Sequence, residues 1–245
     1  GITLDGCEVV EAATPAEAAT TAARLCRDGA AQALMKGSLH TDELMAAVVA
    51  RDAGLRGARR ISHVFAMDVP SYPKPLFVTD AAINIAPDLM TKADIVQNAV
   101  DMLHALGNPL PKVAILSAVE TVNPKIPSTL DAALLCKMAD RGQISGALLD
   151  GPLAFDNAIS RAAARIKKIT SPVAGDADVL VVPDLEAGNM LAKQLSYLAG
   201  ADSAGIVLGA KVPVILTSRA DTVASRLASI ALARLLASAS RQRVA

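Results

Sequence analysis

Residues 212–236 read VPVILTSRADTVASRLASIALARLL, and this stretch contains three parts that together indicate the fold. It begins with a short aliphatic run, which is typical of a buried strand. A small polar turn follows, and then an alanine-rich segment with the amphipathic pattern of a helix. A strand, a turn and a helix in this order form the repeating unit of α/β folds.

The same alternation continues along most of the chain and predicts an α/β fold with a largely parallel sheet. Continuous apolar runs, such as VAILSA at 113–118 and DVLVVP at 178–183, are typical of strands buried on both faces. We expect strands at 8–10, 33–35, 63–69, 76–79, 112–117, 146–149, 179–182, 205–208 and 212–217. We expect helices at 15–28, 42–52, 92–106, 128–140, 154–163, 186–199 and 221–238.

Two short connections depart from this alternation. The strand-like runs SHVFAMDV at 62–69 and PLFVTD at 75–80 are joined by the proline-rich linker PSYPK, which predicts a hairpin or a strand crossing. We interpret this linker as the point where the chain passes from one domain to another. The stretch VLGAKVP at 207–213 joins two strands too tightly for a crossover helix and suggests a domain-crossing connection.

The composition excludes several classes of protein. Hydrophobic residues make up 52% of the 245 residues, which is enough for a sizeable core. Aromatic residues make up only 2% and the net charge is zero, which argues against nucleic acid or an anionic membrane as a partner. The cysteines and histidines show neither disulfide nor metal-ligand spacing, and no signal peptide or membrane span is visible. We therefore expect a cytoplasmic protein without a metal site.

The turn within 212–236 contains the first candidate site. Ser218 and Arg219 stand where the predicted helix begins, and Asp221 follows three residues after Ser218. Helix N-termini bind phosphate and oxyanions through free N–H groups, and Arg219 would add a cation with phosphate-matching geometry. The alternative is a capping box, in which Ser218 and Asp221 only satisfy backbone groups, and the pattern alone favours it.

Three further stretches could bind a ligand. The turn Lys36-Gly37-Ser38 lies between a predicted strand and a predicted helix and could bind an anion through backbone N–H groups, although an ordinary turn explains it as well. Four arginines within 51–60 could hold phosphates or could form a solvated loop. In the helix after the predicted strand at 179–182, Asn189 and Lys193 share one face, although Lys193 could equally be an exposed helical lysine.

Taken together, these stretches resemble the phosphate acetyl/butyryltransferase family, whose members are also called phosphotransacetylases. The residues that carry the resemblance are KGSLHT at 36–41, TDAAINIAPDL at 79–89, ILSAVETVNPKIPSTLDA at 115–132, DGPLAFDNAIS at 150–160, SPVAGDADVLVVPDLEAGNMLAKQL at 171–195 and LTSRADT at 216–222. The resemblance covers nearly the whole chain. It is closest to the butyryl-type members and to those fused to an enoyl-CoA hydratase domain.

The resemblance implies a three-layer α/β/α fold similar to the isocitrate and isopropylmalate dehydrogenases, with two domains, an interdomain cleft and a homodimeric assembly. The first domain would comprise residues 1–66 and 205–245, and the second residues 67–204. Family members usually begin with a further strand and helix, which we expect to be missing here. Because the chain begins with Gly1, we also expect it to be a piece of a longer polypeptide or of a fusion.

The resemblance also implies the reaction, in which an acyl-CoA and phosphate interconvert with an acyl phosphate and coenzyme A. The acyl group would be short, from acetyl to butyryl, and no cofactor would be needed. Ser218 would stabilise the thiolate or oxyanion, Arg219 would hold the phosphoryl group, and Asp221 is the candidate general base. In the acetyl-specific pattern this base lies further into the helix, where the present chain has Ala224 and Ser225.

The remaining candidates would bind substrate: Lys36, Gly37, Ser38, Arg56, Arg60, Asn189, Lys193 and Lys211. Two alternatives stay open beside this interpretation. One is another superfamily member, such as a decarboxylating dehydrogenase or an acyl-carrier-protein phosphate acyltransferase. A dehydrogenase needs a carboxylate cluster for a divalent metal, and the candidate aspartates are spread along the chain: Asp80, Asp88, Asp176 and Asp184. The other is a non-catalytic acyl-CoA-binding or dimerisation domain of a fusion enzyme.

Overall fold

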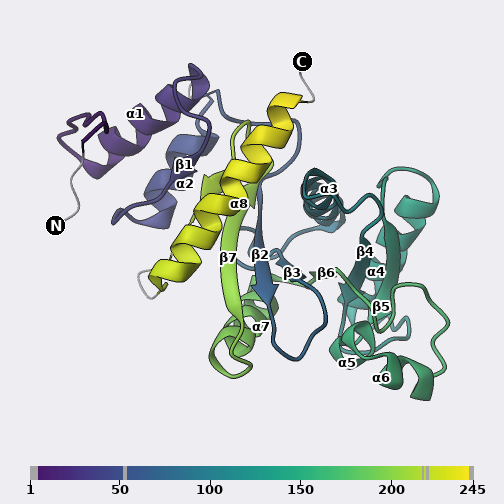
Figure 1. Cartoon of the computed structure of the whole chain (residues 1–245). Helices are drawn as coiled ribbons and strands as arrows, with labels where there is room; N and C mark the ends of the chain where they lie inside the picture. The colour runs from purple at the N-terminus through teal and green to yellow at the C-terminus, as the bar shows by residue number, and fades with distance from the viewer. Residues whose placement is uncertain (1–4, 52–53, 217, 219–220, 243–245) are drawn as a thin grey trace.

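The computed structural model describes residues 5–51, 54–216, 218 and 221–242, and a single eight-stranded sheet runs through it (Figure 1). The strands are β1 (Leu34–Met35), β2 (Ser62–Asp68), β3 (Leu76–Thr79), β4 (Lys112–Leu116), β5 (Leu148–Leu153), β6 (Val179–Val181), β7 (Asp202–Leu208) and β8 (Val214–Ile215). The helices are α1 (Pro15–Arg27), α2 (Thr41–Val49), α3 (Leu89–Ala105), α4 (Pro127–Asp140), α5 (Phe155–Ile159), α6 (Arg161–Ile166), α7 (Leu185–Tyr197) and α8 (Val223–Gln242).

The sheet has the strand order β1-β8-β7-β2-β3-β6-β4-β5 and is mixed. Both flanks are parallel, namely β1 with β8 on one side and β3, β6, β4 and β5 on the other. In the centre, β7 is antiparallel to both β8 and β2, and β2 is antiparallel to β3. The prediction of a largely parallel sheet is therefore right for the flanks and wrong for the centre, because short connections reverse the chain there.

Two of those reversals are the connections that the sequence singled out. The predicted hairpin is confirmed, since β2 and β3 pair from Val64 opposite Thr79 to Met67 opposite Leu76. The connection at 207–213 turns the chain from β7 into its antiparallel neighbour β8. As a result, β1 and β8 end at the opposite end of the sheet from β3, β4, β5 and β6. The division into two domains stays a prediction.

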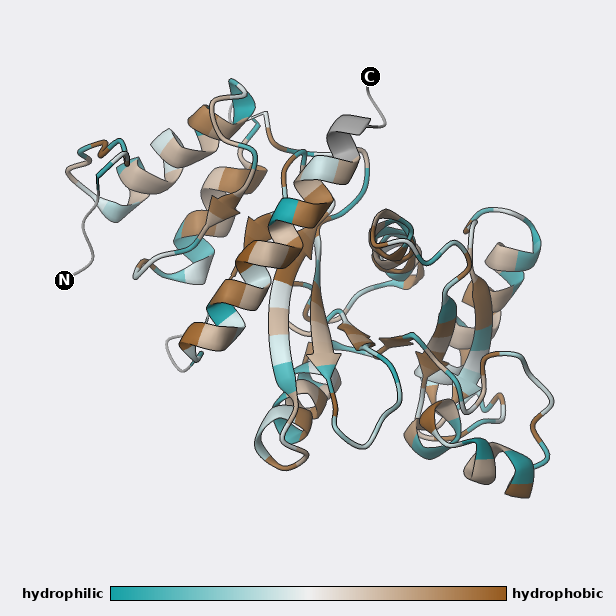
Figure 2. Cartoon of the chain, in the orientation of Figure 1, coloured by the Kyte–Doolittle hydropathy of each residue, from teal (hydrophilic) through white to brown (hydrophobic). Residues whose placement is uncertain are grey.

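Helices pack on both faces of the sheet, because alternate strand residues point to opposite sides. Val113 and Val179 belong to a core cluster formed with α3, α4 and α8, whereas Ala114 and Leu180 belong to one formed with α5 and α7. A third cluster joins α1 and α2 to β1 and β8. Figure 2 shows the hydrophobic residues of β3 and β6, in the middle of the sheet, in brown. Among the described helices, none is both long and apolar enough to cross a membrane.

Two predicted elements differ from the structure. The strand at 8–10 is not formed, and Val9 is 72% exposed, because no described strand lies beside this segment. The helix at 154–163 is divided into α5 and α6 at Ser160, whose side chain accepts a hydrogen bond from the Ala163 N–H and so begins a new helix.

Candidate functional site

The parallel pairing of β1 and β8 brings two of the predicted site segments together. Leu34 lies opposite Val214 and Met35 opposite Ile215, and the Lys36 N–H continues the ladder to the Ile215 carbonyl at 2.9 Å. Lys36 and Leu216 therefore follow neighbouring parallel strands and leave the sheet at the same end. Carboxyl ends of parallel strands are common positions for ligand sites in α/β sheets.

Lys36 is held against its own turn. Its side chain is buried, and Nζ donates to the carbonyl oxygens of Gly37 and Leu39, both at 3.2 Å. Gly37 and Ser38 are exposed. The ammonium therefore lies beneath an exposed small-residue turn, where it could support an anion bound to that turn.

Ser218 and Asp221 hold each other in a local turn. The Ser218 N–H donates to Asp221 Oδ2 at 2.6 Å, and the Asp221 N–H donates to the Ser218 carbonyl at 3.2 Å. Arg219 lies outside the described residues. The prediction that Ser218 begins the helix is wrong, because α8 begins at Val223 and Thr222 caps it by accepting from the Ser225 N–H at 3.1 Å. The Ser218–Asp221 turn thus precedes the helix.

Three predicted substrate-binding residues lie at the other end of β7. The Arg56 backbone forms a bridge to Ala210, and the Lys211 N–H donates to the Leu55 carbonyl at 2.9 Å. The Arg60 N–H donates to Asp94 Oδ2 at 2.9 Å. All three side chains are exposed. The structure does not bring Arg56, Arg60 and Lys211 together with Ser218, because β8 runs away from them toward the start of β7.

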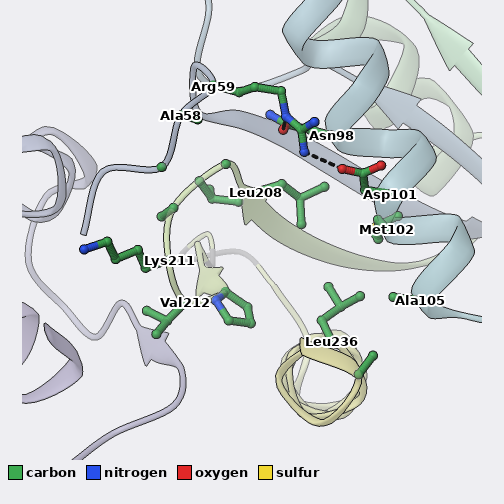
Figure 3. A pocket seen from close by; sticks show the side chains of 16 residues that line it. Ala58, Arg59, Asn98, Asp101, Met102, Ala105, Leu208, Lys211, Val212 and Leu236 are labelled. Atoms are coloured by element: carbon green, nitrogen blue, oxygen red, sulfur yellow. Dashed lines mark hydrogen bonds and ion pairs between the residues drawn. The ribbon is translucent and has the colours of Figure 1, made fainter. Parts of the chain in front are cut away.

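A cavity of about 440 Å³ lies at this second end, between α3, α8 and the turn after β7 (Figure 3). At its rim the Arg59 guanidinium donates to Asn98 Oδ1 at 2.9 Å and pairs with Asp101, while Lys211 points away from that pair. Arg59, a member of the basic cluster at 51–60, thus ties this segment to α3. Among the predicted substrate-binding residues, Lys211 lines the cavity.

The four aspartates of the dehydrogenase alternative each have a structural role. Asp88 and Asp184 cap α3 and α7 by accepting from the N–H groups of the third residue on. Asp80 accepts from the N–H groups at 82, 83 and 84 and so fixes the turn after β3. Asp176 pairs with three cations: Lys74, Lys112 and Arg161. Within the described ranges, no group of three or more histidines, cysteines and carboxylates could hold a metal ion.

On α7, Asn189 and Lys193 have different surroundings. Asn189 Nδ2 donates to the Ala81 carbonyl at 3.3 Å, which ties α7 to the turn fixed by Asp80. Lys193 is exposed, which agrees with the alternative prediction that it is an ordinary surface lysine of the helix. Asn189 is therefore half-buried at the end of β3, whereas Lys193 projects toward solvent.

His63 is a buried titratable residue that the sequence did not single out. It is 1% exposed and lies on β2, next to Phe65 and Gly205. Burial lowers the pKa of His63 from its usual 6.5 to about 4, and the charges of Asp80 and Asp221 oppose this shift without cancelling it. A histidine inside an otherwise aliphatic strand offers no sequence pattern that would have identified it.

This pKa gives the first expected result, which concerns stability. Between pH 6.5 and 4 the unfolded chain binds a proton at His63 that the folded chain does not, so the free energy of unfolding should fall as the pH falls through this window. The loss should be about 3 kcal/mol at pH 4 relative to pH 7. Urea unfolding at several pH values measures it.

Replacing His63 with leucine should flatten this pH dependence. Asp176 also has a shifted pKa, but it titrates outside this window. Burial raises the pKa of Asp176, yet hydrogen bonds from Lys112 and Lys74 outweigh burial and lower this pKa from 3.8 to about 2. The stability that Asp176 contributes is therefore lost only below pH 4. An unchanged slope between pH 6.5 and 4 in His63→Leu would contradict the assignment of this window to His63.

Comparisons with known proteins agree with these observations. The chain matches the sequence model of a family described as "Phosphate acetyl/butaryl transferase" over residues 4–234. The phosphate acetyltransferase of Rhizobium meliloti is 64% identical over 96% of this chain and 74% of that protein. The probable phosphate butyryltransferase of Bacillus subtilis (strain 168) is 52% identical over 92% of this chain and 76% of that protein.

Solved structures with a similar fold include members of the same family. A branched-chain phosphotransacylase from Enterococcus faecalis V583 has a TM-score of 0.87 at 37% identity, covering 93% of this chain and 82% of that chain. A 4-hydroxythreonine-4-phosphate dehydrogenase from Klebsiella pneumoniae has a TM-score of 0.53 at 17% identity, covering 91% of this chain and 70% of that chain. This second likeness concerns the fold alone, which is thus shared with a dehydrogenase.

Proposed function

This chain belongs to the phosphate acetyl/butyryltransferase family, and we propose how its residues carry out the family reaction. The enzyme interconverts an acyl-CoA and phosphate with a short-chain acyl phosphate and coenzyme A. We place the reaction at the turns 36–38 and 216–221. The observation that carries this proposal is the parallel β1–β8 pairing, after which the chain leaves the same end of the sheet at Lys36 on one strand and at Leu216 on the other.

In the proposed reaction, the sulfur of coenzyme A attacks the carbonyl carbon of the acyl phosphate. The carbon–sulfur bond forms, the bond from carbon to the phosphate oxygen breaks, and phosphate leaves. A free thiol has a pKa near 8.5, so the thiolate needs a base and stabilising donors. We assign Asp221 as the base, Ser218 as the donor to the thiolate or oxyanion, and Arg219 as the phosphoryl ligand. The reciprocal hydrogen bonds of Ser218 and Asp221 support this assignment.

The other predicted residues receive separate roles in this proposal. Lys36, Gly37 and Ser38 bind the phosphoryl group beside Ser218. Because they lie at the other end of β7, Arg56, Arg60 and Lys211 bind the nucleotide phosphates of coenzyme A instead. Asn189 and Lys193 follow the end of β3 and therefore lie at the same end of the sheet as Arg60, so we propose that they contact coenzyme A there.

We also propose the setting of the reaction. The domains 1–66 with 205–245 and 67–204 face each other across the site, and no cofactor is needed beyond coenzyme A and phosphate as substrates. The enzyme is cytoplasmic and a homodimer. Leu130 and Leu134 support a dimer, because they are partly exposed one turn apart on α4 and offer a second copy an apolar surface.

An assay of the purified chain with coenzyme A and acetyl, propionyl and butyryl phosphate tests this proposal. We expect thioester and free phosphate to appear in equal amounts. Because one methylene changes transition-state binding by about 1–3 kcal/mol, kcat/KM should differ by about tenfold to a hundredfold between neighbouring acyl lengths. A folded chain that binds coenzyme A but forms no thioester with any of the three would instead be a non-catalytic binding domain.

A further inference from the structure

A second cavity, of about 360 Å³, lies beside α6 and the starts of β4 and β6. Three cations and one carboxylate line it: Lys112, Arg161, Arg165 and Asp176. The rest of its wall is apolar except for Ser171. None of the lining residues belongs to the acyl-transfer site proposed above, so the function of this cavity has to be explained separately.

The cavity is far from the proposed acyl-transfer site. Strands β7, β2, β3 and β6 lie between β8, which leads to Ser218, and β4, which begins with Lys112. Because neighbouring strands are about 4.8 Å apart, β8 and β4 are separated by roughly 24 Å. Figure 1 likewise shows α6 well apart from α8, the helix that follows Ser218. A small molecule in this cavity therefore does not reach Ser218.

Helix α6 presents two arginines to the cavity. Arg161 and Arg165 are four residues apart, so their side chains project from the same side of the helix. The Arg161 guanidinium lies 3.0 Å from Asp176 Oδ2, yet 69% of its side chain is exposed. Arg165 is exposed, and its side chain makes no hydrogen bond or ion pair within the part of the chain that the structure describes. Each guanidinium has five N–H donors, so most of these donors are available to a ligand.

Asp176 holds several of the surrounding cations in place. It pairs with Lys74 at 3.1 Å and with Lys112 at 2.5 Å, in addition to Arg161. Lys74 also pairs with Asp178 at 2.6 Å. Together with Arg165, four cations thus gather around two carboxylates, which leaves an excess of two positive charges at neutral pH.

The chain around α6 adds further positive charge. Residues 161–168 read RAAARIKK and contain four cations without a carboxylate. Of the two lysines, Lys167 pairs with Glu120 and Asp156, whereas Lys168 is exposed. The mouth of the cavity is therefore positively charged in a protein whose net charge is zero, and it favours an anion.

The walls of the cavity are fixed by tight packing. Gly175 has a φ of +78°, and a Cβ atom there would lie 2.5 Å from the Cα atom of Arg161, so only glycine lets this segment pack on the start of α6. The Gly175 N–H donates to the Ala158 carbonyl at 3.1 Å, and Ser171 Oγ accepts from the Val173 N–H at 3.0 Å. A ligand thus meets a preformed surface, which lowers the entropic cost of binding.

A structural role does not explain the two arginines. An ion pair as exposed as that of Arg161 contributes little to the free energy of unfolding. Arg165 contributes nothing through a partner, because none of the described residues pairs with it. Lys74 and Lys112 already bind Asp176, so this carboxylate does not require a third cation.

We infer that this cavity is a second binding site, which takes an organic phosphate with its phosphate group on Arg161 and Arg165 and its apolar body against Ile169 and Pro172. A phosphate monoester carries close to two negative charges at neutral pH, which matches the excess of positive charge. The planar guanidinium binds two phosphate oxygens at once. The apolar wall and a volume typical of small-molecule sites favour an organic ligand over the bare anion.

Isothermal titration calorimetry with AMP as the probe tests this inference. AMP combines a phosphate monoester with a flat ring, and inorganic phosphate and adenosine each supply one half of it. We expect AMP to bind at least about tenfold more tightly than either half, and its affinity to fall with added sodium chloride because the arginines are exposed. Equal affinities of AMP and adenosine, or of AMP and inorganic phosphate, would overturn the assignment of the two parts of the site.

The double variant Arg161→Ala/Arg165→Ala locates the bound AMP. It should keep its melting temperature, because both side chains are exposed, and should bind AMP at least about tenfold more weakly than the wild type. The control is Arg24→Ala, an exposed arginine of α1, which should bind AMP as the wild type does. Wild-type affinity in the folded double variant would show that AMP binds elsewhere and would overturn the inference. The titration contains no acyl phosphate, so its outcome is independent of whether the chain catalyses acyl transfer.

Discussion

Replacing Arg219 with alanine should lower the rate of acyl transfer about a hundredfold or more, which is the range for loss of one preorganised donor to a developing charge. Arg219 directly follows Ser218, which comes three residues after Ile215 at the end of the parallel β1–β8 pair. Its guanidinium can bind two phosphoryl oxygens at once, which a lysine cannot. Steady-state kinetics with acyl phosphate and coenzyme A measure the effect. The rate of Arg219→Lys should lie between those of Arg219→Ala and the wild type.

The matched control for Arg219→Ala is Arg234→Ala. Arg234 is an exposed arginine in the middle of α8, about three turns after Val223, so its removal changes the net charge equally without touching the proposed site. We expect wild-type kinetics for this control. If Arg219→Ala also retained near-normal activity, Arg219 would have no part in the mechanism, and the phosphoryl group would have to be held by Lys36 and its turn.

The largest expected loss of stability comes from the ion pair between α3 and α4. Lys92 Nζ lies 2.6 Å from Asp131 Oδ2, and the Lys92 side chain is 7% exposed whereas that of Asp131 is 27% exposed. Asp131→Ala leaves a buried ammonium without a partner, which should cost about 3–5 kcal/mol of the free energy of unfolding. Urea unfolding at neutral pH measures the loss.

The burial of Lys92 also predicts an asymmetry between the two partners. Lys92→Met removes the buried charge and leaves a carboxylate that water can reach, so it should cost clearly less than Asp131→Ala. The control is Asp140→Ala, which breaks an exposed pair with Lys137 on the same α4 and should change stability by less than about 1 kcal/mol. Equal losses for Lys92→Met and Asp131→Ala would show that burial of the ammonium does not dominate.

The sequence predicted helices, strands and turns correctly where neighbouring residues alone determine them. The apolar runs at 113–118 and 178–183 form β4 and β6, and the proline-rich linker at 70–74 joins an antiparallel pair as expected. Strand direction in the centre of the sheet was not predictable, because the pairing of β7 with β2 joins segments far apart in the chain. The strand at 8–10 failed for a related reason, since a β-branched run forms a strand only where a neighbour is available.

The candidate site was predictable only in part. Lys36 and Leu216 leave the sheet at the same end because two strand–turn–helix units have neighbouring parallel strands, and the separation of Arg60 from Ser218 follows from the direction of β8. Neither relation can be predicted from short stretches of sequence. The hydrogen bond from the Ser218 N–H to the Asp221 carboxylate is one half of the predicted capping box, but the Asp221 N–H donates to the Ser218 carbonyl, and the two bonds close a turn before α8 instead of the helix itself.

The antiparallel pairing of β2 with β7 has a consequence for synthesis of the chain. His63 and Val207 are roughly 140 residues apart, so β2 cannot find its central partner until most of the polypeptide has left the ribosome. Until then β2 can pair on one side only, with β3, and its other edge stays open to solvent and to other nascent chains. A partly synthesised chain is therefore expected to be more prone to aggregation than the complete one, until the late strands are available to cover this edge.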